Sequence, residues 1–238
     1  MKKIIFTGGS GRFGSVFKKL KTNYKIFFPS KKQLNVVKIK TVENFIKRVK
    51  PSYFIHAAAI SRPMNLHEKK ISESIDANII GTANVVKICS KYKIKLIYFS
   101  TNYVYPSQTG KYNEKSALNP INNYAWSKLG GESAVQMYPN SLILRICMTE
   151  KPFIHNKAFS NLKTNFIYHE DLAKILTKLI KIRGIINIGG PTQSVYNFVK
   201  KDNPNIKKKL LKIKSKKNPL NSTMDIKKFK KFKESKIF

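Results

Sequence analysis

Acidic residues, cysteine and long apolar runs are all scarce in this sequence. The two cysteines, Cys89 and Cys147, lie far apart in apolar surroundings, which excludes a disulfide framework and the close ligand spacing of a metal site. We therefore predict buried thiols, no metal site and a reducing compartment. The apolar stretch that follows Met1-Lys-Lys is too short for a signal peptide, and no later run approaches membrane-spanning length. These absences predict a cytoplasmic protein without a membrane partner.

The shortage of acid leaves a large positive charge. Against 12 Asp and Glu there are 47 Lys and Arg, a formal net charge of +35, which is typical of proteins that bind nucleic acid. Lysine is nevertheless spread through every segment and accompanies abundant Ile, Asn, Phe and Tyr, a bias typical of an AT-rich genome. Only the stretches 200–217 and 227–233 concentrate it, and there we expect a solvated surface. We therefore do not predict nucleic acid as the partner. Association with nucleic acid stays an alternative hypothesis that rests on the charge alone.

Short apolar runs alternate with amphipathic stretches along the first 146 residues. This order predicts an α/β fold, a Rossmann-type doubly wound parallel sheet with crossover helices. We expect strands at 2–6, 25–28, 53–57, 95–100 and 142–146, and helices at 13–22, 41–50, 75–92 and 123–138.

The pattern changes after Arg145. There we expect an irregular stretch at 148–166, a helix from His169 to about Ile182, a strand within 184–190 and a small helical region from Pro191. The sequence thus predicts two parts. Residues 1–146 form the Rossmann domain, and residues 147–238 form a small, shortened substrate-binding region with a lysine-rich tail.

The first expected strand runs directly into a glycine turn. Gly8, Gly11 and Gly14 form the pattern GxxGxxG. The first two would let the backbone turn beside a pyrophosphate, the third would let a helix pack closely on the strand, and the helix N-terminus would supply N–H groups. On its own, however, the pattern is equally consistent with an ordinary strand-to-helix turn.

A second motif contains residues that could catalyse a reaction of a bound cofactor. Tyr124 and Lys128 are four residues apart, hence one turn apart on one helix face. A lysine ammonium and a nicotinamide cation held close would favour the phenolate, making the tyrosine a usable acid or base near neutral pH. The expected strand at 95–100 ends beside Ser100 and Thr101, where a hydroxyl could bond the same substrate oxygen that the tyrosine protonates.

Glycine turn, strand-end hydroxyl and YxxxK, in that order, resemble the extended short-chain dehydrogenase/reductase superfamily. Three segments are most similar to the dTDP-4-dehydrorhamnose reductase family and related sugar-nucleotide reductases. Ser100-Thr-Asn-Tyr-Val-Tyr105 is similar to the family's STDYVF, Asn122-Asn-Tyr-Ala-Trp-Ser-Lys-Leu-Gly-Gly-Glu132 to its NxYGxSKxxGE, and Asn221-Ser-Thr-Met-Asp225 to its NSxLD. Further agreement lies at His56-Ala-Ala-Ala59, Asn78-Ile-Ile-Gly81-Thr82, Tyr168-His-Glu-Asp171 and Asn187-Ile-Gly-Gly-Pro191.

The resemblance implies a reaction and the residues that carry it. Thr101, Tyr124 and Lys128 would be catalytic, with Tyr124 protonating a keto oxygen while a reduced nicotinamide delivers hydride to the carbonyl carbon. Lys128 would also bond the nicotinamide ribose. The substrate, a nucleotide-linked 4-keto-6-deoxy sugar, would meet Ser100, Thr101, Asn102 and Tyr124.

The cofactor implied is NADP, with NAD left open. NAD-specific proteins usually hold an acidic residue at the end of the second strand, whereas here Ser30, Lys31 and Lys32 could accommodate a 2′-phosphate. Those lysines are also consistent with the general lysine bias. The cofactor-binding residues we expect are Gly8, Gly9, Ser10, Gly11, Arg12, Phe13, Gly14, Ser30, Lys31, Asn35, Val36, Ala57, Ala58, Ala59, Tyr124 and Lys128.

Two neighbouring functions stay open. Sugar dehydratases of the superfamily follow the threonine with an Asp-Glu pair, which Asn102 and Tyr103 cannot replace, but an epimerase needs the same three catalytic residues. The stretch 145–168 is shorter than the family's pocket-building segment, and the family also resembles the regulatory subunit of methionine adenosyltransferase. A non-catalytic NADP-binding subunit is therefore a further alternative, as is a homodimer.

We predict that three of the histidines are not catalytic. His56, at the end of a central strand, is expected to line the cofactor site. His155 and His169 are expected to be structural, because His169 lies at a helix start where Glu170 and Asp171 suit the helix dipole.

Overall fold

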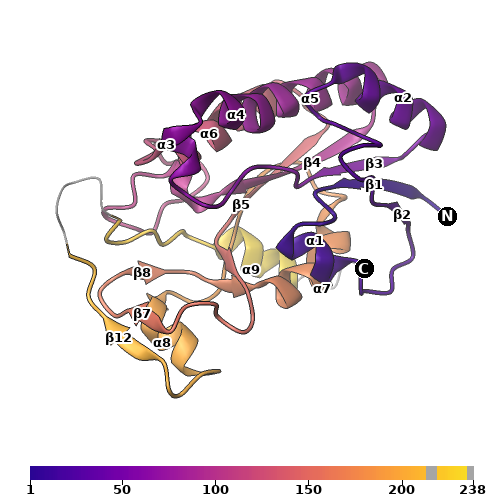
Figure 1. The fold of residues 1–238 in the computed structure, drawn as a ribbon. Coiled ribbons are helices and arrows are strands. Elements are labelled where there is room, and N and C mark those ends of the chain that lie inside the picture. The colour runs from indigo at the N-terminus through magenta and orange to yellow at the C-terminus, as the bar shows by residue number, and fades with distance from the viewer. Residues whose placement is uncertain (213–218, 235–238) are drawn as a thin grey trace.

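A computed structural model describes residues 1–212 and 219–234, and a parallel sheet forms its centre (Figure 1). The strands follow the order β10-β5-β4-β3-β1-β2, and every neighbouring pair is parallel. This confirms the predicted doubly wound α/β fold. Its strands are β1 (Lys3–Thr7), β2 (Lys25–Phe27), β3 (Tyr53–His56), β4 (Lys95–Thr101), β5 (Ser141–Ile146) and β10 (Gly184–Ile188).

The strand order reverses between β1 and β3. From β1 the chain adds β2 on one side, and then crosses to place β3 and the later strands on the other. Loops that leave the carboxyl ends of β1 and β3 therefore diverge, and the crevice between them is where ligands bind in open α/β sheets. The topology alone places the glycine turn and the segment 57–59 at this crevice.

Helices cover both faces of the sheet (Figure 1). Central strands such as β4 are buried along their whole length, as expected when both faces of a parallel sheet are covered. One face carries α2 (Ile39–Val49), α5 (Gly81–Lys91) and α6 (Asn123–Gln136), and the other α1 (Arg12–Phe17), α7 (His169–Leu179) and α9 (Lys227–Glu234).

The helix expected at 75–92 is part of a longer helical run. It consists of α4 (Ile71–Ile75), the π-helical segment η1 (Asp76–Ile80) and α5, and is preceded by α3 (Leu66–Lys69). The helix expected at 13–22 is shorter than predicted. It ends at Phe17 because the chain must turn to enter the edge strand β2 at Lys25. A 3₁₀ turn, η2 (Asn102–Val104), follows β4.

The C-terminal part adds a small second core (Figure 1). Ala158, Val195, Phe198, Val199 and Ile206 form it. Its elements are β6 (Met148–Thr149) paired with β9 (Ile167–Tyr168), β7 (Lys157–Phe159) with β12 (Lys207–Lys209), β8 (Lys163–Thr164) with β11 (Gln193–Ser194), and α8 (Val195–Lys200).

Two expectations for this part were wrong. The stretch 148–166 contains three short strands, and the region after Pro191 contains strands as well as helices. The partners of these strands lie far along the chain, so no local pattern marks them. Division of the chain at residue 146 stays a prediction, although the main sheet takes β10 from beyond that point. Residues 213–217 of the expected basic tail lie outside the described residues.

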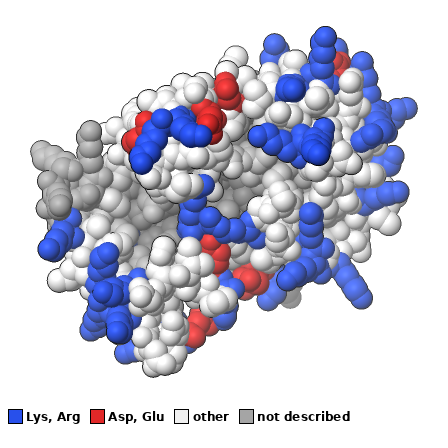
Figure 2. All heavy atoms as spheres, in the orientation of Figure 1, with Lys and Arg blue, Asp and Glu red and all other residues white. Residues whose placement is uncertain are grey.

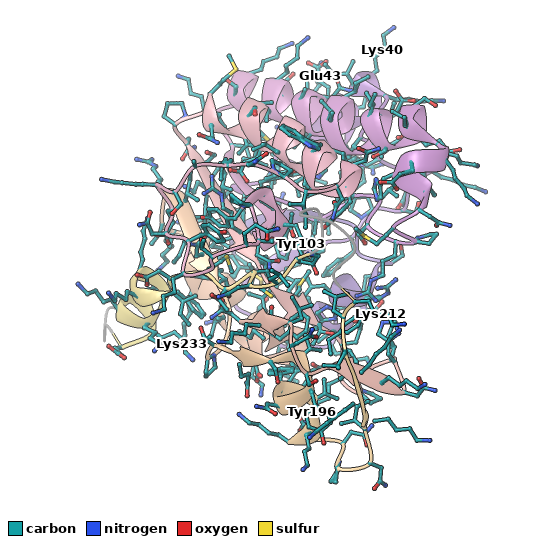
Figure 3. The ribbon with its side chains drawn as sticks, turned by 90° about the vertical axis from the view of Figure 1, so that its left-hand side faces the viewer. Lys40, Glu43, Tyr103, Tyr196, Lys212 and Lys233 are labelled. Atoms are coloured by element: carbon teal, nitrogen blue, oxygen red, sulfur yellow. The ribbon has the colours of Figure 1, made fainter. Side chains whose placement is uncertain are left out.

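Lysine and arginine side chains are spread over much of the visible surface in Figure 2, with few acidic side chains among them. Figure 3 places Tyr103 between the helical layer that carries Lys40 and Glu43 and the smaller part that carries Tyr196 and Lys212. Within residues 1–212 and 219–234, no helix combines the length and the apolar character needed to cross a bilayer.

Candidate active site

A cavity of about 590 Å³ opens at the carboxyl ends of β1, β3, β4 and β5. It lies at the crevice expected from the strand order and gathers residues from widely separated segments. Of the predicted site residues it is lined by Gly8, Gly9, Ser10, Gly11, Arg12, Phe13, Gly14, Lys31, Asn35, Val36, Ala57, Ala58, Ala59, Ser100, Thr101, Asn102, Tyr124 and Lys128.

One predicted residue is absent from the cavity wall. Ser30 is exposed, and its hydroxyl accepts a long hydrogen bond of 3.4 Å from the backbone N–H of Gln33. The turn after β2 therefore presents Lys31, but not Ser30, to the cavity.

The glycine turn lies against the segment that follows β3. Gly8 has a φ of +81°, and a Cβ at this position would come within 2.8 Å of the Ala57 backbone. The N–H of Gly11 closes the turn on the Gly8 carbonyl at 3.0 Å. Gly14 lies in α1, where a Cβ would meet the same carbonyl at 2.4 Å. The close approach expected from GxxGxxG is thus present, and it leaves main chain along the cavity wall.

Thr101, Tyr124 and Lys128 meet on the opposite side of the cavity. Thr101 ends β4, and the other two lie one turn apart on α6. The Thr101 hydroxyl donates a long hydrogen bond of 3.5 Å to the Asn102 side-chain oxygen and accepts one from the Tyr103 N–H at 3.3 Å. Helix α6 begins just before this group, where the Asn122 side chain caps it by accepting from the Ala125 N–H at 2.8 Å.

Burial dominates the electrostatics of this group. Burial raises the pKa of Tyr124 above its ordinary value, while the hydrogen bond from Thr101 and the positive charge of Arg62 act in the opposite direction. Burial also lowers the pKa of Lys128 to about 7, against the charge of Glu132. In the protein without cofactor, desolvation therefore outweighs the groups that favour the phenolate. The expected joint effect of Lys128 and a nicotinamide cation stays a prediction. Tyr124 keeps its proton at neutral pH, the form that can donate one.

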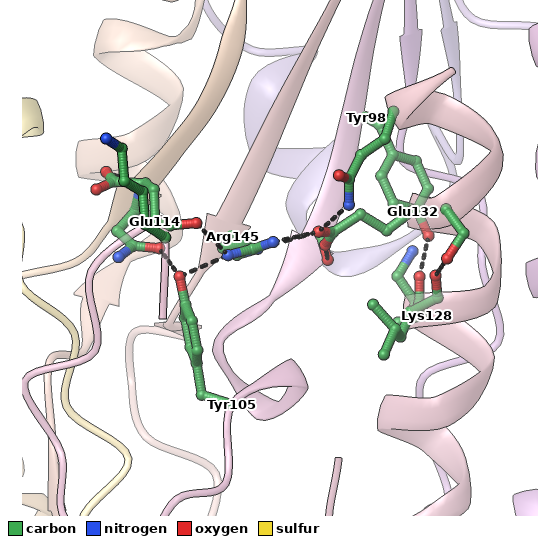
Figure 4. Close-up of polar contacts among 12 residues, drawn as sticks. Tyr98, Tyr105, Glu114, Lys128, Glu132 and Arg145 are labelled. Atoms are coloured by element: carbon green, nitrogen blue, oxygen red, sulfur yellow. Dashed lines mark hydrogen bonds and ion pairs between the residues drawn. The ribbon is translucent and has the colours of Figure 1, made fainter. Parts of the chain in front are cut away.

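A buried ion pair joins α6 to β5 near Lys128 (Figure 4). The Glu132 carboxylate of α6 accepts from Arg145 of β5 at 2.6 and 3.1 Å, and both side chains are at most 2% exposed. The other oxygen of Glu132 accepts from the Ser100 hydroxyl at 2.5 Å. These bonds join α6 to β4 and β5. Ser100 was expected to contact the substrate, but its hydroxyl donates to Glu132 in this structure.

Further hydrogen bonds surround the ion pair (Figure 4). Arg145 also donates to the Tyr105 hydroxyl at 2.8 Å and to the Glu114 carbonyl at 3.1 Å. On the other side, the Tyr98 hydroxyl donates to the Lys128 carbonyl at 3.0 Å, and the Lys128 ammonium lies 4.2 Å from the Tyr98 ring centroid. Fully bonded buried networks of this kind hold side chains in one arrangement.

The segment Asn221–Asp225 supports the site from behind. Asn102 lines the cavity, but its amide donates to the Ser222 carbonyl at 3.3 Å. Asn187 in the edge strand β10 donates to the Asp225 carbonyl at 3.2 Å. The third segment that resembles the reductase family therefore fixes the position of Asn102.

The histidines do not all lie where they were expected. His56 is fully buried and is held by Thr7 at 2.9 Å and Thr82 at 3.1 Å, and it is not among the cavity residues. The expectation that it lines the site was wrong, because its ring points into the core below the turn. His169 does line the cavity, with its ring edge-on to Phe13 at 5.9 Å between centroids.

Sequence reasoning missed two charged residues of the cavity. Arg62 and Glu150 both line it, and they join Arg12 in an ion-pair cluster. Arg62 follows β3 and Glu150 follows β6, which itself comes just after β5. Proximity to the carboxyl ends of parallel strands was the available signal, but neither residue belongs to a recognisable motif.

Comparisons with known proteins show the family of this chain. The family model described as the RmlD substrate binding domain matches residues 1–156. A dTDP-4-dehydrorhamnose reductase of Aggregatibacter actinomycetemcomitans is 27% identical over 204 residues, 82% of this chain and 64% of that protein. Methionine adenosyltransferase 2 subunit beta of Xenopus laevis is 30% identical over 155 residues, 61% of this chain and 46% of that protein. The chain thus spans less than two thirds of either curated relative.

A solved structure is similar over nearly the whole chain. It is the dTDP-4-dehydrorhamnose reductase of Bacillus anthracis in complex with NADP, which matches with a TM-score of 0.84 and 25% identity. The match covers 97% of this chain and 91% of that one.

Proposed function

We propose that this chain, which belongs to the RmlD substrate binding domain family, is an NADPH-dependent reductase of a nucleotide-linked 4-keto-6-deoxy sugar. One observation carries the proposal: Thr101, Tyr124 and Lys128 line the same cavity as the glycine turn. The similarity to a reductase solved with NADP supports the choice of cofactor and reaction.

The residues of the cavity fit a dinucleotide. At Gly8 a Cβ would strike the Ala57 backbone, so the turn can bring main chain close to a pyrophosphate. The segment that follows β2 has no carboxylate from Phe28 to Val36, and Lys31 lines the cavity there. A 2′-phosphate would suit this end better than the bare ribose hydroxyls of NAD. NADPH, when bound, would supply the hydride for the carbonyl carbon.

The chain's own residues would handle the proton. Tyr124, protonated at neutral pH, would donate its proton to the carbonyl oxygen as negative charge develops there. Thr101, which lines the same cavity as Tyr124, would orient the phenol and bond the same substrate oxygen. Lys128, which burial makes easy to deprotonate, lies one turn away and could return a proton to Tyr124.

The first prediction concerns Tyr124 and tests the reaction. Purified protein is expected to oxidise NADPH when given a dTDP- or UDP-linked 4-keto-6-deoxy sugar, and Tyr124→Phe should lower kcat by about 10²- to 10⁴-fold, the usual contribution of a positioned acid. Tyr196→Phe, on α8 and outside the cavity, is the control that should keep wild-type kcat.

Two other outcomes would replace the proposal. Tight NADP binding without turnover on any keto sugar would favour a regulatory subunit, a reading supported by the similarity to methionine adenosyltransferase 2 subunit beta. Conversion of the sugar without net consumption of NADPH would instead identify an epimerase.

A further inference from the structure

Three charged side chains meet at the cavity between the glycine turn and the catalytic group. Arg12 begins α1, Arg62 follows β3, and Glu150 follows β6. Both guanidinium groups donate to the same oxygen of Glu150, Arg12 at 2.8 Å and Arg62 at 3.2 Å. All three residues line the cavity. The carboxylate therefore joins three segments that are far apart in sequence.

The cluster is accessible from solvent on its basic side. The side chains of Arg12 and Arg62 are 48% and 39% exposed, whereas that of Glu150 is 14% exposed. Partial burial raises the pKa of Glu150, but a hydrogen bond from its own backbone N–H, together with the two arginines, keeps this pKa below its ordinary value. At neutral pH the cluster thus holds two cations and one anion, with a net charge of +1.

The two cations come from different parts of the cavity wall. Arg12 belongs to the glycine turn, where a pyrophosphate would lie. Arg62 comes from the segment that follows β3 and lines the same cavity as Tyr103 and Tyr124. A guanidinium pairs with phosphate oxygens as well as with carboxylate oxygens, and its fork suits either. A ligand phosphate between the two halves of the cavity would therefore find both arginines already converging on one oxygen.

We propose that Arg12 and Arg62 form a binding site for the diphosphate group of a ligand, and that Glu150 occupies this site in the free protein until the ligand displaces it. The inference deepens the proposed function, on which it rests for the identity of the ligand. The diphosphate could belong to the dinucleotide or to the nucleotide sugar, and both share this chemistry. Glu150 lowers the affinity for either, because its ion pairs must break before the phosphate can pair.

Removing the Glu150 charge tests this competition. Glu150→Gln keeps the size of the side chain but weakens its hold on both arginines, so it should tighten binding of the displacing ligand about 3- to 10-fold, the range expected from losing two partly exposed ion pairs. Arg62→Gln should weaken binding of the same ligand by a similar factor. NADPH and dTDP are titrated separately by calorimetry at one ionic strength, and the ligand whose affinity both variants change is the one that sits between the arginines.

Glu43→Gln is the matched control. Glu43 also lies between two cations, Lys91 at 2.8 Å and Lys47 at 3.7 Å, but on α2 and away from the cavity. It makes the same change in net charge, so an effect of overall charge alone would tighten binding equally in both variants. The inference would be overturned if Glu150→Gln and Glu43→Gln bound each ligand with equal affinity. It would also be overturned if the protein bound neither NADPH nor dTDP.

Turnover, measured separately, distinguishes this inference from the proposed function. A protein that reduces the keto sugar but whose Glu150→Gln variant binds neither ligand more tightly overturns only the role of Glu150. A protein that binds NADPH more tightly as Glu150→Gln but reduces no keto sugar overturns only the reductase proposal.

Discussion

The ring of His56 lies at the end of β3, enclosed between two threonine hydroxyls. The cavity in front of it is open to ligands, but the ring itself is fully buried. Burial, with a smaller effect from the charge of Lys128, lowers the pKa of His56 to about 3 from an ordinary value of 6.5. In mildly acidic solution this ring is therefore protonated in the unfolded chain and neutral in the folded protein.

The consequence is a loss of stability in mild acid. Between pH 6.5 and 3, His56 is protonated in the unfolded chain but stays neutral in the folded protein. The free energy of unfolding contributed by His56 is therefore fully present above pH 6.5. It falls by up to about 1.4 kcal/mol per pH unit as the pH decreases. His56→Gln should remove about this much of the slope, as measured by urea unfolding from about pH 6.5 to about pH 4.5, a window above most carboxylate titration. His67 and His169, whose pKa values burial also lowers, account for part of the remaining slope.

His155→Gln is the control for this prediction. His155 is exposed, so replacing it is expected to leave the slope unchanged. A His56→Gln variant with the full wild-type slope would show that His56 is not the group responsible.

At the level of single residues, the sequence predicted which side chains share the cavity better than it predicted their hydrogen-bond partners. The YxxxK spacing and the hydroxyl at the end of β4 are local patterns, and the structure brings Thr101, Tyr124 and Lys128 together. Ser100 was assigned to the substrate from its place at the strand end, and its bond to Glu132 could not be predicted because the two residues are 32 apart. Desolvation of Tyr124 was equally invisible, since it depends on the whole set of surrounding segments.

Helix α6 carries Tyr124 and Lys128, two of the three residues proposed to be catalytic, and its position depends on a close contact through Gly131. A Cβ on Gly131 would come within 2.4 Å of the Asn78 carbonyl in η1 and 2.8 Å of the Tyr98 hydroxyl. The preceding glycine is different. The atoms nearest to a Cβ on Gly130 belong to the Ile79 side chain, Cδ1 at 2.8 Å and Cγ1 at 3.0 Å.

These neighbours predict opposite tolerance to alanine. Ala favours a helix over Gly by about 1 kcal/mol, but Gly131→Ala must push α6 away from main chain, so it should be destabilising by about 1 to 3 kcal/mol overall. Gly130→Ala, the control on the same helix, should lie within about 1 kcal/mol of wild type because a flexible side chain can move aside. Urea unfolding measures both, and equal stabilities of the two variants would contradict the packing argument.

The same contrast explains which elements could be predicted. The strands of the main sheet and most of its helices carry their own periodicity, such as the buried positions Val42, Phe45, Ile46 and Val49 of α2. The strands β7 and β8 are two or three residues long and pair with β12 and β11, so only the tertiary structure defines them. The extension of the helical run back to Ile71 was missed for a related reason, because this surface segment has no strong apolar stripe.

The whole molecule carries 35 more positive than negative charges. Ion pairs join several acidic residues to neighbouring cations, for example Glu43 to Lys91 and Asp225 to Lys227. With 12 acidic residues against 47 basic ones, however, most cations cannot have an acidic residue of their own. Repulsion among them should therefore exceed the attraction within the exposed pairs, each of which contributes about 1 kcal/mol at most.

Screening should consequently stabilise this protein. From about 0.01 M to about 0.15 M sodium chloride the Debye length falls from about 30 Å to about 8 Å, which weakens repulsion across the surface more than contacts at bonding distance. We expect the Tm to rise by at least about 3 °C over this range, the shift that corresponds to roughly 1 kcal/mol in a chain of this size. Differential scanning calorimetry in sodium chloride and again in potassium chloride measures it, and equal rises in the two salts would exclude binding of one specific cation. A flat or falling Tm would mean that the ion pairs outweigh the excess of lysine, and that the positive charge is arranged with more compensation than its spread along the sequence indicates.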